Sequence, residues 1–208
     1  EREHVLFYLA EVLYRVVPNF YEEIADAIAR HYGVEADSIS LPTIIRFGTW
    51  VGGDMDGNPD VHAKSMRETL ARQQRAIINA YFTEVQDLAQ ALSQSGSRVG
   101  ILPALQQRID EYDTLLPSSR SSAPARHDRM PYRVFLGQVA ERLRATYDGR
   151  PAAYEGPAQF QRDVDLIAES LRRHRGRHAG LFAIRRLQRR IATFGFHLAT
   201  LDIRQHAA

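Results

Sequence analysis

The chain has 208 residues, enough for one domain or a large subdomain with its own core, and 27 basic against 25 acidic residues leave a net charge of only +2. This balance excludes the strong positive field of a dedicated nucleic-acid binder. The lack of cysteine excludes disulfides, thiolate metal sites and a cysteine nucleophile, and no apolar run approaches the roughly twenty residues that span a bilayer, so we expect a soluble, cytoplasmic protein.

The first predicted element is a helix from the N-terminus to residue 17. Its apolar residues recur every three to four positions, and Pro18 is expected to end it because proline lacks the amide hydrogen that a helix needs. A second helix is expected to follow at once, with Asn19 and Glu22 as a capping pair and Gly33 as its C-terminal stop. Since the chain starts without methionine and inside a helix, we expect a piece of a longer protein.

A short buried strand is predicted next, followed by a polar loop. β-Branched and aromatic residues mark the strand: Ile44, Ile45, Phe47, Trp50 and Val51. The loop, residues 52–59 (GGDMDGNP), contains glycines that accept positive φ and a proline that breaks regular pairing. Loops at the carboxyl ends of strands are where α/β enzymes place substrate-handling groups, because the strand aims the loop.

The remainder is predicted to be helical up to a second strand. Apolar residues at helical spacing predict these helices: 61–95, 101–116, 131–147, 156–174 and 179–193. Residues 117–130, PSSRSSAPARHDRM, have almost nothing to bury and are predicted to form a mobile surface loop. Gly195 is expected to close the last helix, and residues 196–203 to form the second buried strand. We therefore predict one helix-rich unit over residues 1–208, mostly α with two short strands that need neighbours.

Two motifs resemble those of phosphoenolpyruvate carboxylases. Residues 47–59, FGTWVGGDMDGNP, are similar to the family's F-x-S-W-x-G-G-D-R-D-G-N-P, and residues 194–205, FGFHLATLDIRQ, look like its F-G-x-x-L-x-x-L-D-I-R-Q strand. The two motifs occur in the same order as in the family and at roughly the same spacing. A match to both is more specific than a match to either motif alone. The resemblance implies a central fragment of a much longer enzyme, with both strands in a helix-rich β/α (TIM-like) barrel.

The resemblance also implies an activity. The family's enzymes are cytoplasmic lyases that carboxylate phosphoenolpyruvate with bicarbonate, giving oxaloacetate and phosphate, in a carbon dioxide fixation that feeds the tricarboxylic acid cycle. They use magnesium, are allosteric, and form homo-oligomers, namely tetramers. The catalytic histidine of the family lies upstream of this segment, and its catalytic lysine and metal-binding carboxylates lie downstream. We therefore expect neither a catalytic nor a metal-binding residue in this chain, and an isolated fragment without activity.

Arg204 and Trp50 are the predicted substrate-binding residues. Arg204 matches the motif arginine that contacts phosphoenolpyruvate in the family, and an arginine at the carboxyl end of a strand can hold a phosphate with its planar fork of donors. The alternative is a salt bridge to a neighbouring carboxylate. Trp50 matches a tryptophan that lines the apolar pocket for bicarbonate or carbon dioxide, where water would destroy the intermediates. Ordinary core packing is the alternative for Trp50.

The loop is expected to shape the mouth of the barrel through a set of small and polar residues: Gly52, Gly53, Asp54, Asp56, Gly57 and Asn58. Met55 stands where the family usually has arginine, so any ion pair of that arginine is in question here. A calcium loop does not fit. With Asp54 as position one, the glycine of position six would be Pro59 and the glutamate of position twelve would be Ser65.

Arginine-rich segments suggest two further roles. Arg133, in a P-Y-R-V helix start, resembles a family arginine associated with an anionic activator site, and exposed amides at a helix start suit an anion. The runs RRHRGRH (172–178) and RRLQRR (185–190) carry the competing hypothesis of a helical module that binds an effector or nucleic acid. We expect these runs to be solvated helix faces, because no aromatic stacking platform accompanies them.

Overall fold

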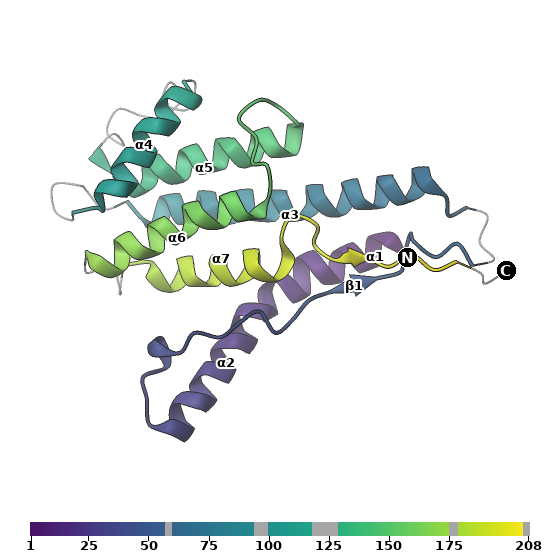
Figure 1. Ribbon diagram of the computed structural model, residues 1–208, viewed down its shortest axis with the longest axis horizontal. Helices are drawn as coiled ribbons and strands as arrows, with labels where there is room; N and C mark the ends of the chain where they lie inside the picture. Colours follow the sequence, from purple (N-terminus) through teal and green to yellow (C-terminus); the bar gives the residue numbers. More distant parts are fainter. Residues whose placement is uncertain (57–59, 94–99, 118–128, 175–178, 206–208) are drawn as a thin grey trace. The chain divides into compact units, whose positions relative to one another are not determined.

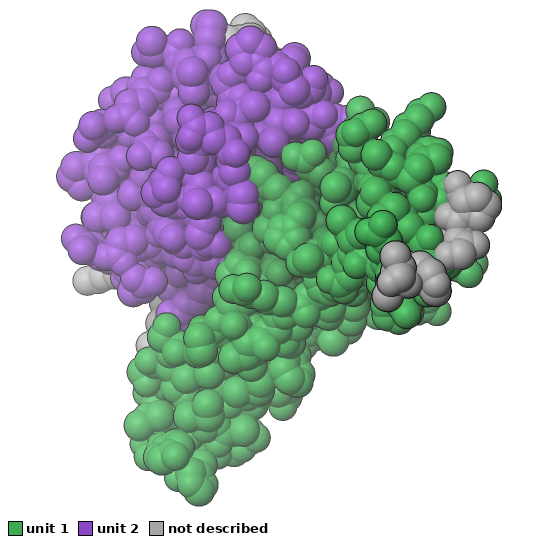
Figure 2. Space-filling model, turned by 45° about the vertical axis from the view of Figure 1, so that its right-hand side comes forward, with its two compact units in different colours: residues 1–77, 189–208 green, residues 78–188 purple. Residues whose placement is uncertain are grey.

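The structure of the chain is a computed structural model that describes residues 1–56, 60–93, 100–117, 129–174 and 179–205. It is mostly α-helical with two short strands, as expected. The chain divides into two compact units, one made of residues 1–77 and 189–208 and the other of residues 78–188 (Figure 2). Most of the predicted mobile loop, 118–128, lies outside the described residues.

The first unit begins with one continuous helix instead of two. Helix α1 (Arg2–Phe7) leads through the π-helical segment η1 (Tyr8–Leu13) into α2 (Tyr14–Tyr32), and the junction residues keep right-handed helical dihedral angles. Gly33 ends α2 with a φ of 66°, as predicted. Pro18 is buried inside α2, so the prediction that a helix ends there and a new one begins at Asn19 is wrong.

An arginine from the other end of the chain explains why the helix tolerates Pro18. Proline leaves the carbonyl of the residue four positions earlier, Tyr14, without its helical N–H donor. Nε of Arg190 donates to that carbonyl over 2.9 Å, and the guanidinium carbon lies 4.7 Å from the centroid of the Tyr14 ring. The partner lost by the helix backbone is thereby replaced by a side chain of α7 (Leu181–Phe194).

Replacing Arg190 by methionine is therefore expected to cost about 1–3 kcal/mol of unfolding free energy, because the Tyr14 carbonyl loses its donor. Pro18→Ala restores a backbone N–H at the right position. In that background the Arg190→Met substitution should cost measurably less, a coupling that urea denaturation of the two single variants and the double variant would measure. Strict additivity of the two substitutions would contradict this explanation.

The two strands pair directly and in parallel. In β1 (Gly48–Thr49) and β2 (Thr200–Leu201), Gly48 lies opposite Thr200 and Thr49 opposite Leu201 (Figure 1). The amide of Thr200 donates to the carbonyl of Phe47, and that of Asp202 to the carbonyl of Thr49, each over 2.8 Å. The 3-10 turn η2 (Ala36–Ser38) precedes β1.

Both strands are shorter and more exposed than predicted. The side chains expected to be buried are 52% exposed at Ile44, 56% at Trp50 and 64% at Ile203. Phe196 and Leu198, also predicted to lie in the second strand, are 8% and 1% exposed but come before β2, so the prediction of two buried strands is wrong for their length and only partly right for their burial. Phe47 is partly sheltered by stacking on Phe194, with 5.3 Å between ring centroids.

The second unit is a helical core. Helices α4 (Pro103–Leu115), α5 (Pro131–Asp148) and α6 (Pro157–Arg173) pack against one another (Figure 1). The second half of α3 (Ala63–Ala91) and the first half of α7 belong to the same unit. These five helices confirm the predicted ones, with small differences at their ends.

A fully buried carboxylate lies at the centre of the second unit. Asp163 of α6 has no exposed surface and accepts hydrogen bonds from the hydroxyls of Tyr112, at 2.6 Å, and Tyr154, at 2.7 Å. Arg108 donates to its other oxygen over 2.9 Å. Arg142, with a side chain 10% exposed, lies with its guanidinium carbon 3.9 Å from the Tyr154 ring centroid and donates to the Tyr112 hydroxyl. Four groups from two helices, α4 and α5, and the loop before α6 therefore surround the carboxylate of Asp163.

This environment holds both tyrosines in their neutral form. Burial raises the pKa of Tyr154 well above its ordinary value of about 10, and the negative charge of Asp163 acts in the same direction. The pKa of Tyr112 is raised as well, first by burial and then by Asp163. The two hydroxyls therefore remain hydrogen-bond donors to Asp163 up to alkaline pH.

Candidate functional site

The parallel pairing brings the two sequence motifs together in the first unit. Beyond the ends of the strands, the amide of Met55 donates to the carbonyl of Arg204 over 2.8 Å, and the amide of Arg204 donates to the carbonyl of Gly53 over 3.1 Å. Asp54 and Arg204 thus form a further parallel bridge. Met55 takes part through its backbone amide, so the loop is attached to the strand without a contribution from the Met55 side chain.

The side chains of Arg204 and Asp54 also lie near each other. Nη1 of Arg204 is 3.7 Å from Oδ2 of Asp54, and the two side chains are 57% and 33% exposed. The ion pair considered as an alternative from the sequence is therefore present, although exposed pairs of this length contribute little to stability. The other oxygen of Asp54 accepts the amide of Asp56 over 3.3 Å. Much of the guanidinium surface of Arg204 remains accessible to a ligand.

Two glycines allow the loop to lie against its neighbours. Gly52 has a φ of 94°, and a Cβ atom there would lie 2.5 Å from Oγ1 of Thr69. A Cβ atom on Gly53 would overlap the carbonyl oxygen of Asp202, the residue that follows β2. Both glycines lie in the loop, as predicted, whereas their contacts with Thr69 and Asp202 were not predicted, because nothing in the local sequence shows which atoms the loop contacts.

Gly53→Ala is expected to destabilise the protein by about 1–3 kcal/mol, because the added methyl group forces the loop away from the second strand. Gly137→Ala is the matched control. Gly137 lies within α5, where an added methyl group would have nothing within 4 Å, so alanine there should stabilise by about 0.5–1 kcal/mol. Thermal and urea unfolding of both variants would measure the two effects, and a neutral Gly53→Ala would contradict the tight approach.

Trp50 lies at the start of the same loop, and its carbonyl accepts the amide of Gly53 over 2.8 Å. Trp50 is 56% exposed, so it does not have the ordinary core packing considered as an alternative within the described chain. The loop residues Gly57 and Asn58 lie outside the described residues. Of the predicted site residues, the structure therefore gathers six at one end of the two strands: Trp50, Gly52, Gly53, Asp54, Asp56 and Arg204.

The segment that leads into β1 is anchored by residues that sequence analysis did not assign to the site. The Tyr21 hydroxyl accepts the amides of Ile44, at 2.8 Å, and Ile45, at 3.2 Å. Arg189 donates to the carbonyl of Leu41 over 3.1 Å, and its guanidinium carbon lies 4.0 Å from the centroid of the Tyr21 ring. Arg189 is thus a structural cation, and the expectation of a solvated face is wrong at this end of the run 185–190.

The other arginine candidates lie in the second unit. Arg133 is the third residue of α5 and is half-buried. Arg172 and Arg173 both pair with Glu169 on the exposed surface of α6, as expected of a solvated helix face. Residues 175–178 of the same run lie outside the described residues.

Neither a metal centre nor a membrane span is found in the described part of the chain. No group of three or more histidine, aspartate or glutamate side chains is placed to hold a metal ion among the described residues. Likewise, no helix in the described ranges combines the length and the apolar composition needed to cross a membrane.

Comparison with known proteins gives one consistent result. A family model described as phosphoenolpyruvate carboxylase matches residues 1–208. A phosphoenolpyruvate carboxylase of Xanthomonas campestris pv. campestris (strain 8004) is 48% identical over 208 residues, which cover 100% of this chain and 23% of the relative. The enzyme of Nitrosomonas eutropha is 33% identical over 218 residues, covering 100% of this chain and 22% of the relative. The chain therefore spans about a quarter of the length of these relatives.

Proposed function

Because this chain belongs to the phosphoenolpyruvate carboxylase family, we propose that it is a central segment of a lyase that carboxylates phosphoenolpyruvate with bicarbonate to give oxaloacetate and phosphate. The structural observation that carries the proposal is the parallel pairing of β1 with β2, which joins the loop after Trp50 to the backbone of Arg204. We further propose that these are neighbouring strands of a β/α barrel whose other strands lie outside this chain.

In the proposed reaction Arg204 binds the phosphate of phosphoenolpyruvate. Its guanidinium group is largely exposed at the end of a strand, and its one carboxylate partner within the described chain, Asp54, is a loose 3.7 Å away. A phosphate offers oxygen atoms that match the planar fork of an arginine, with shorter and stronger bonds than this ion pair. The substrate phosphate would therefore compete well with Asp54 for Arg204.

Trp50 supplies an apolar wall in the same proposal. Phosphate transfer from phosphoenolpyruvate to bicarbonate gives carboxyphosphate and an enolate, and carbon–carbon bond formation then gives oxaloacetate. Water would hydrolyse the first intermediate and protonate the second, so a site that excludes water protects both. The exposed indole of Trp50, held by the Trp50–Gly53 turn, is available to line such a site.

The remaining chemistry is assigned to residues outside this chain. We propose that magnesium is bound by residues elsewhere in the longer protein, because the resemblance places the family's metal-binding carboxylates downstream of this segment. We propose that the longer enzyme is a cytoplasmic homo-oligomer and that Arg133 belongs to an anionic effector site. The isolated 208-residue chain is proposed to be inactive, because the family's proton-transfer groups are not among its motifs.

A coupled assay tests the proposed function. The full-length protein that contains this chain should form oxaloacetate, detected by reduction with malate dehydrogenase and NADH, only when phosphoenolpyruvate, bicarbonate and magnesium are all supplied. The 208-residue chain should form none under the same conditions. A full-length protein without bicarbonate-dependent oxaloacetate formation would refute the function, and activity of the isolated chain would refute the assignment of the chemistry to other segments.

A further inference from the structure

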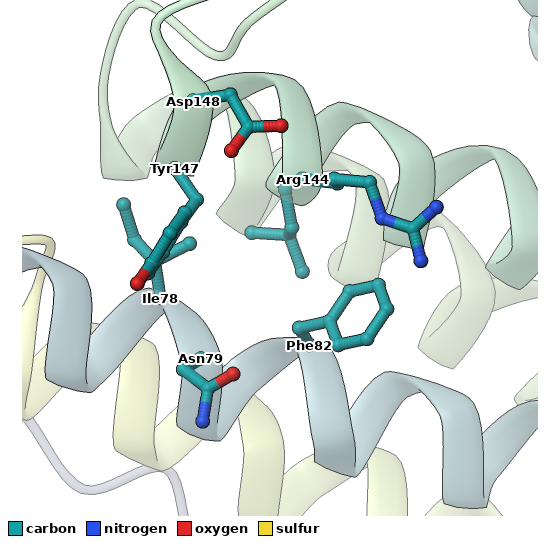
Figure 3. A pocket seen from close by; sticks show the side chains of 7 residues that line it. Ile78, Asn79, Phe82, Arg144, Tyr147 and Asp148 are labelled. Atoms are coloured by element: carbon teal, nitrogen blue, oxygen red, sulfur yellow. The ribbon is translucent and has the colours of Figure 1, made fainter.

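A cavity of about 360 Å³ in the second unit has no part in the proposed carboxylase chemistry. It lies between α3 and α5, and all the residues that line it belong to this unit (Figure 3). Its volume falls in the range of about 300–1,000 Å³ that is typical of small-molecule sites. The cavity combines an apolar interior with charged groups at one edge, which is the usual arrangement of a site that orients its ligand.

The interior of the cavity is suited to a flat apolar body. Ile78 and Leu143 form its base and are 1% and 0% exposed. The rings of Phe82 and Tyr147 lie on opposite sides of the space, one on each helix (Figure 3). Aromatic rings on two sides favour an aromatic ligand, because stacked or edge-to-face ring contacts add to the burial of apolar area.

Arg144 provides the charge at the edge. Its side chain is 56% exposed, and its guanidinium carbon lies 5.2 Å from the centroid of the Phe82 ring. Its nearest carboxylate in the described chain, Glu141, is 3.7 Å away and accepts two shorter contacts, both 3.2 Å, from Arg150. Arg150 also binds Asp148, which lines the cavity, over 3.0 Å, so Arg144 and Arg150 together balance the charges of Glu141 and Asp148. Arg144 is the cation that an incoming anion would meet.

We propose that this cavity binds a small aromatic carboxylate. The aromatic ring would lie between Phe82 and Tyr147, and the carboxylate would accept two hydrogen bonds from the guanidinium of Arg144. This proposal does not depend on the function proposed for the motif loops, because it uses residues of the second unit alone.

Titration of the protein with 3-phenylpropanoate, followed by calorimetry and ligand-observed NMR, tests this site. The acid should saturate a single site, and its uncharged analogue 3-phenylpropanamide should bind at least tenfold more weakly, because a neutral amide forms weaker bonds with a guanidinium than a carboxylate does. Equal affinities for the acid and the amide, or a lack of saturable binding by the acid, would overturn the proposal.

Variants locate the binding. Arg144→Gln should weaken binding of the acid at least tenfold and leave binding of the amide within twofold, whereas Phe82→Leu should weaken both ligands. Arg173→Gln removes the same charge from an exposed position on α6 and should change neither affinity. Arg144→Lys keeps the charge without the planar fork and should give an intermediate affinity. An affinity for the acid that Arg144→Gln leaves unchanged would rule the cavity out.

Discussion

Replacing Arg204 by glutamine in the full-length enzyme is expected to lower kcat/KM for phosphoenolpyruvate by about 10²–10³-fold, the loss typical when one preorganised donor to a reacting anion is removed. The reason is the proposed phosphate contact, since glutamine keeps much of the side-chain length but has neither the charge nor the fork of donors. Inhibition by inorganic phosphate should weaken in parallel. The kcat/KM of Arg204→Lys should lie between those of the unmodified enzyme and Arg204→Gln, because lysine keeps the charge but not the planar fork of donors.

Asp54→Asn separates this role from the ion pair. If Arg204 acted only by pairing with Asp54, the two substitutions would have the same effect on kcat/KM. We expect Asp54→Asn to cost less than about tenfold, because it removes an exposed pair worth about 1 kcal/mol or less. Thermal unfolding should show both variants close to the unmodified enzyme. A large loss of stability in Arg204→Gln would indicate that the arginine supports the fold and not the substrate.

Replacing Asp163 by alanine is expected to lower the free energy of unfolding by about 3–5 kcal/mol, the cost of removing one partner from a buried ion pair. The substitution leaves Arg142 buried without its carboxylate and deprives the hydroxyls of Tyr112 and Tyr154 of their acceptor. Asp163→Asn, which keeps the shape but loses the charge, should cost less and serves where the alanine variant does not fold. Urea denaturation followed by circular dichroism would measure both.

Asp165→Asn is the matched control for Asp163. Asp165 lies on the same helix but is exposed, where it accepts hydrogen bonds from the side-chain amides of Gln161 and Gln188. Its replacement should change stability by less than about 1 kcal/mol, as is usual at the surface. Similar effects of the two substitutions would show that the network around Asp163 carries no special share of the stability.

The same network predicts a pH dependence. The unfolded tyrosines ionise at about pH 10, whereas the folded Tyr112 and Tyr154 have raised pKa values and keep their protons. Above about pH 10 the unfolded state therefore binds fewer protons than the folded state, and stability falls as pH rises. Tyr154→Phe should make this alkaline decline less steep, which urea denaturation at a series of alkaline pH values would measure.

The sequence predicts the helices of the second unit well because their apolar residues repeat locally. It does not predict Asp163, whose environment depends on three helices and a loop. One local signal was available: Asp163 stands between Phe160 and Ile167 on the buried side of α6, where an acidic residue needs buried partners. The identity of those partners, Tyr112, Tyr154 and Arg142, comes only from the tertiary packing.

The first unit shows the limits of local rules more clearly. Pro18 predicts a break, but the donor that replaces its missing N–H belongs to Arg190, which follows most of the chain. The motif residues Trp50 and Arg204 were assigned to one site through a family resemblance, and their strands do pair. Their register and the contact of Gly53 with Asp202 could not be predicted, because both are set by atoms of distant segments.

The first unit consists of two segments, residues 1–77 and 189–208, that are separated in sequence by the second unit, and this affects the order of folding. The second unit is one uninterrupted segment, residues 78–188, whose helices meet mainly near neighbours in sequence, so it can fold early. β1 is synthesised before that segment and β2 after it, and contacts so far apart in the chain form slowly. During synthesis on the ribosome, the loop after Trp50 can therefore pair with the backbone of Arg204 only after residues 78–188 have been made. The residues proposed to bind substrate are therefore expected to come together only after most of this chain has been synthesised.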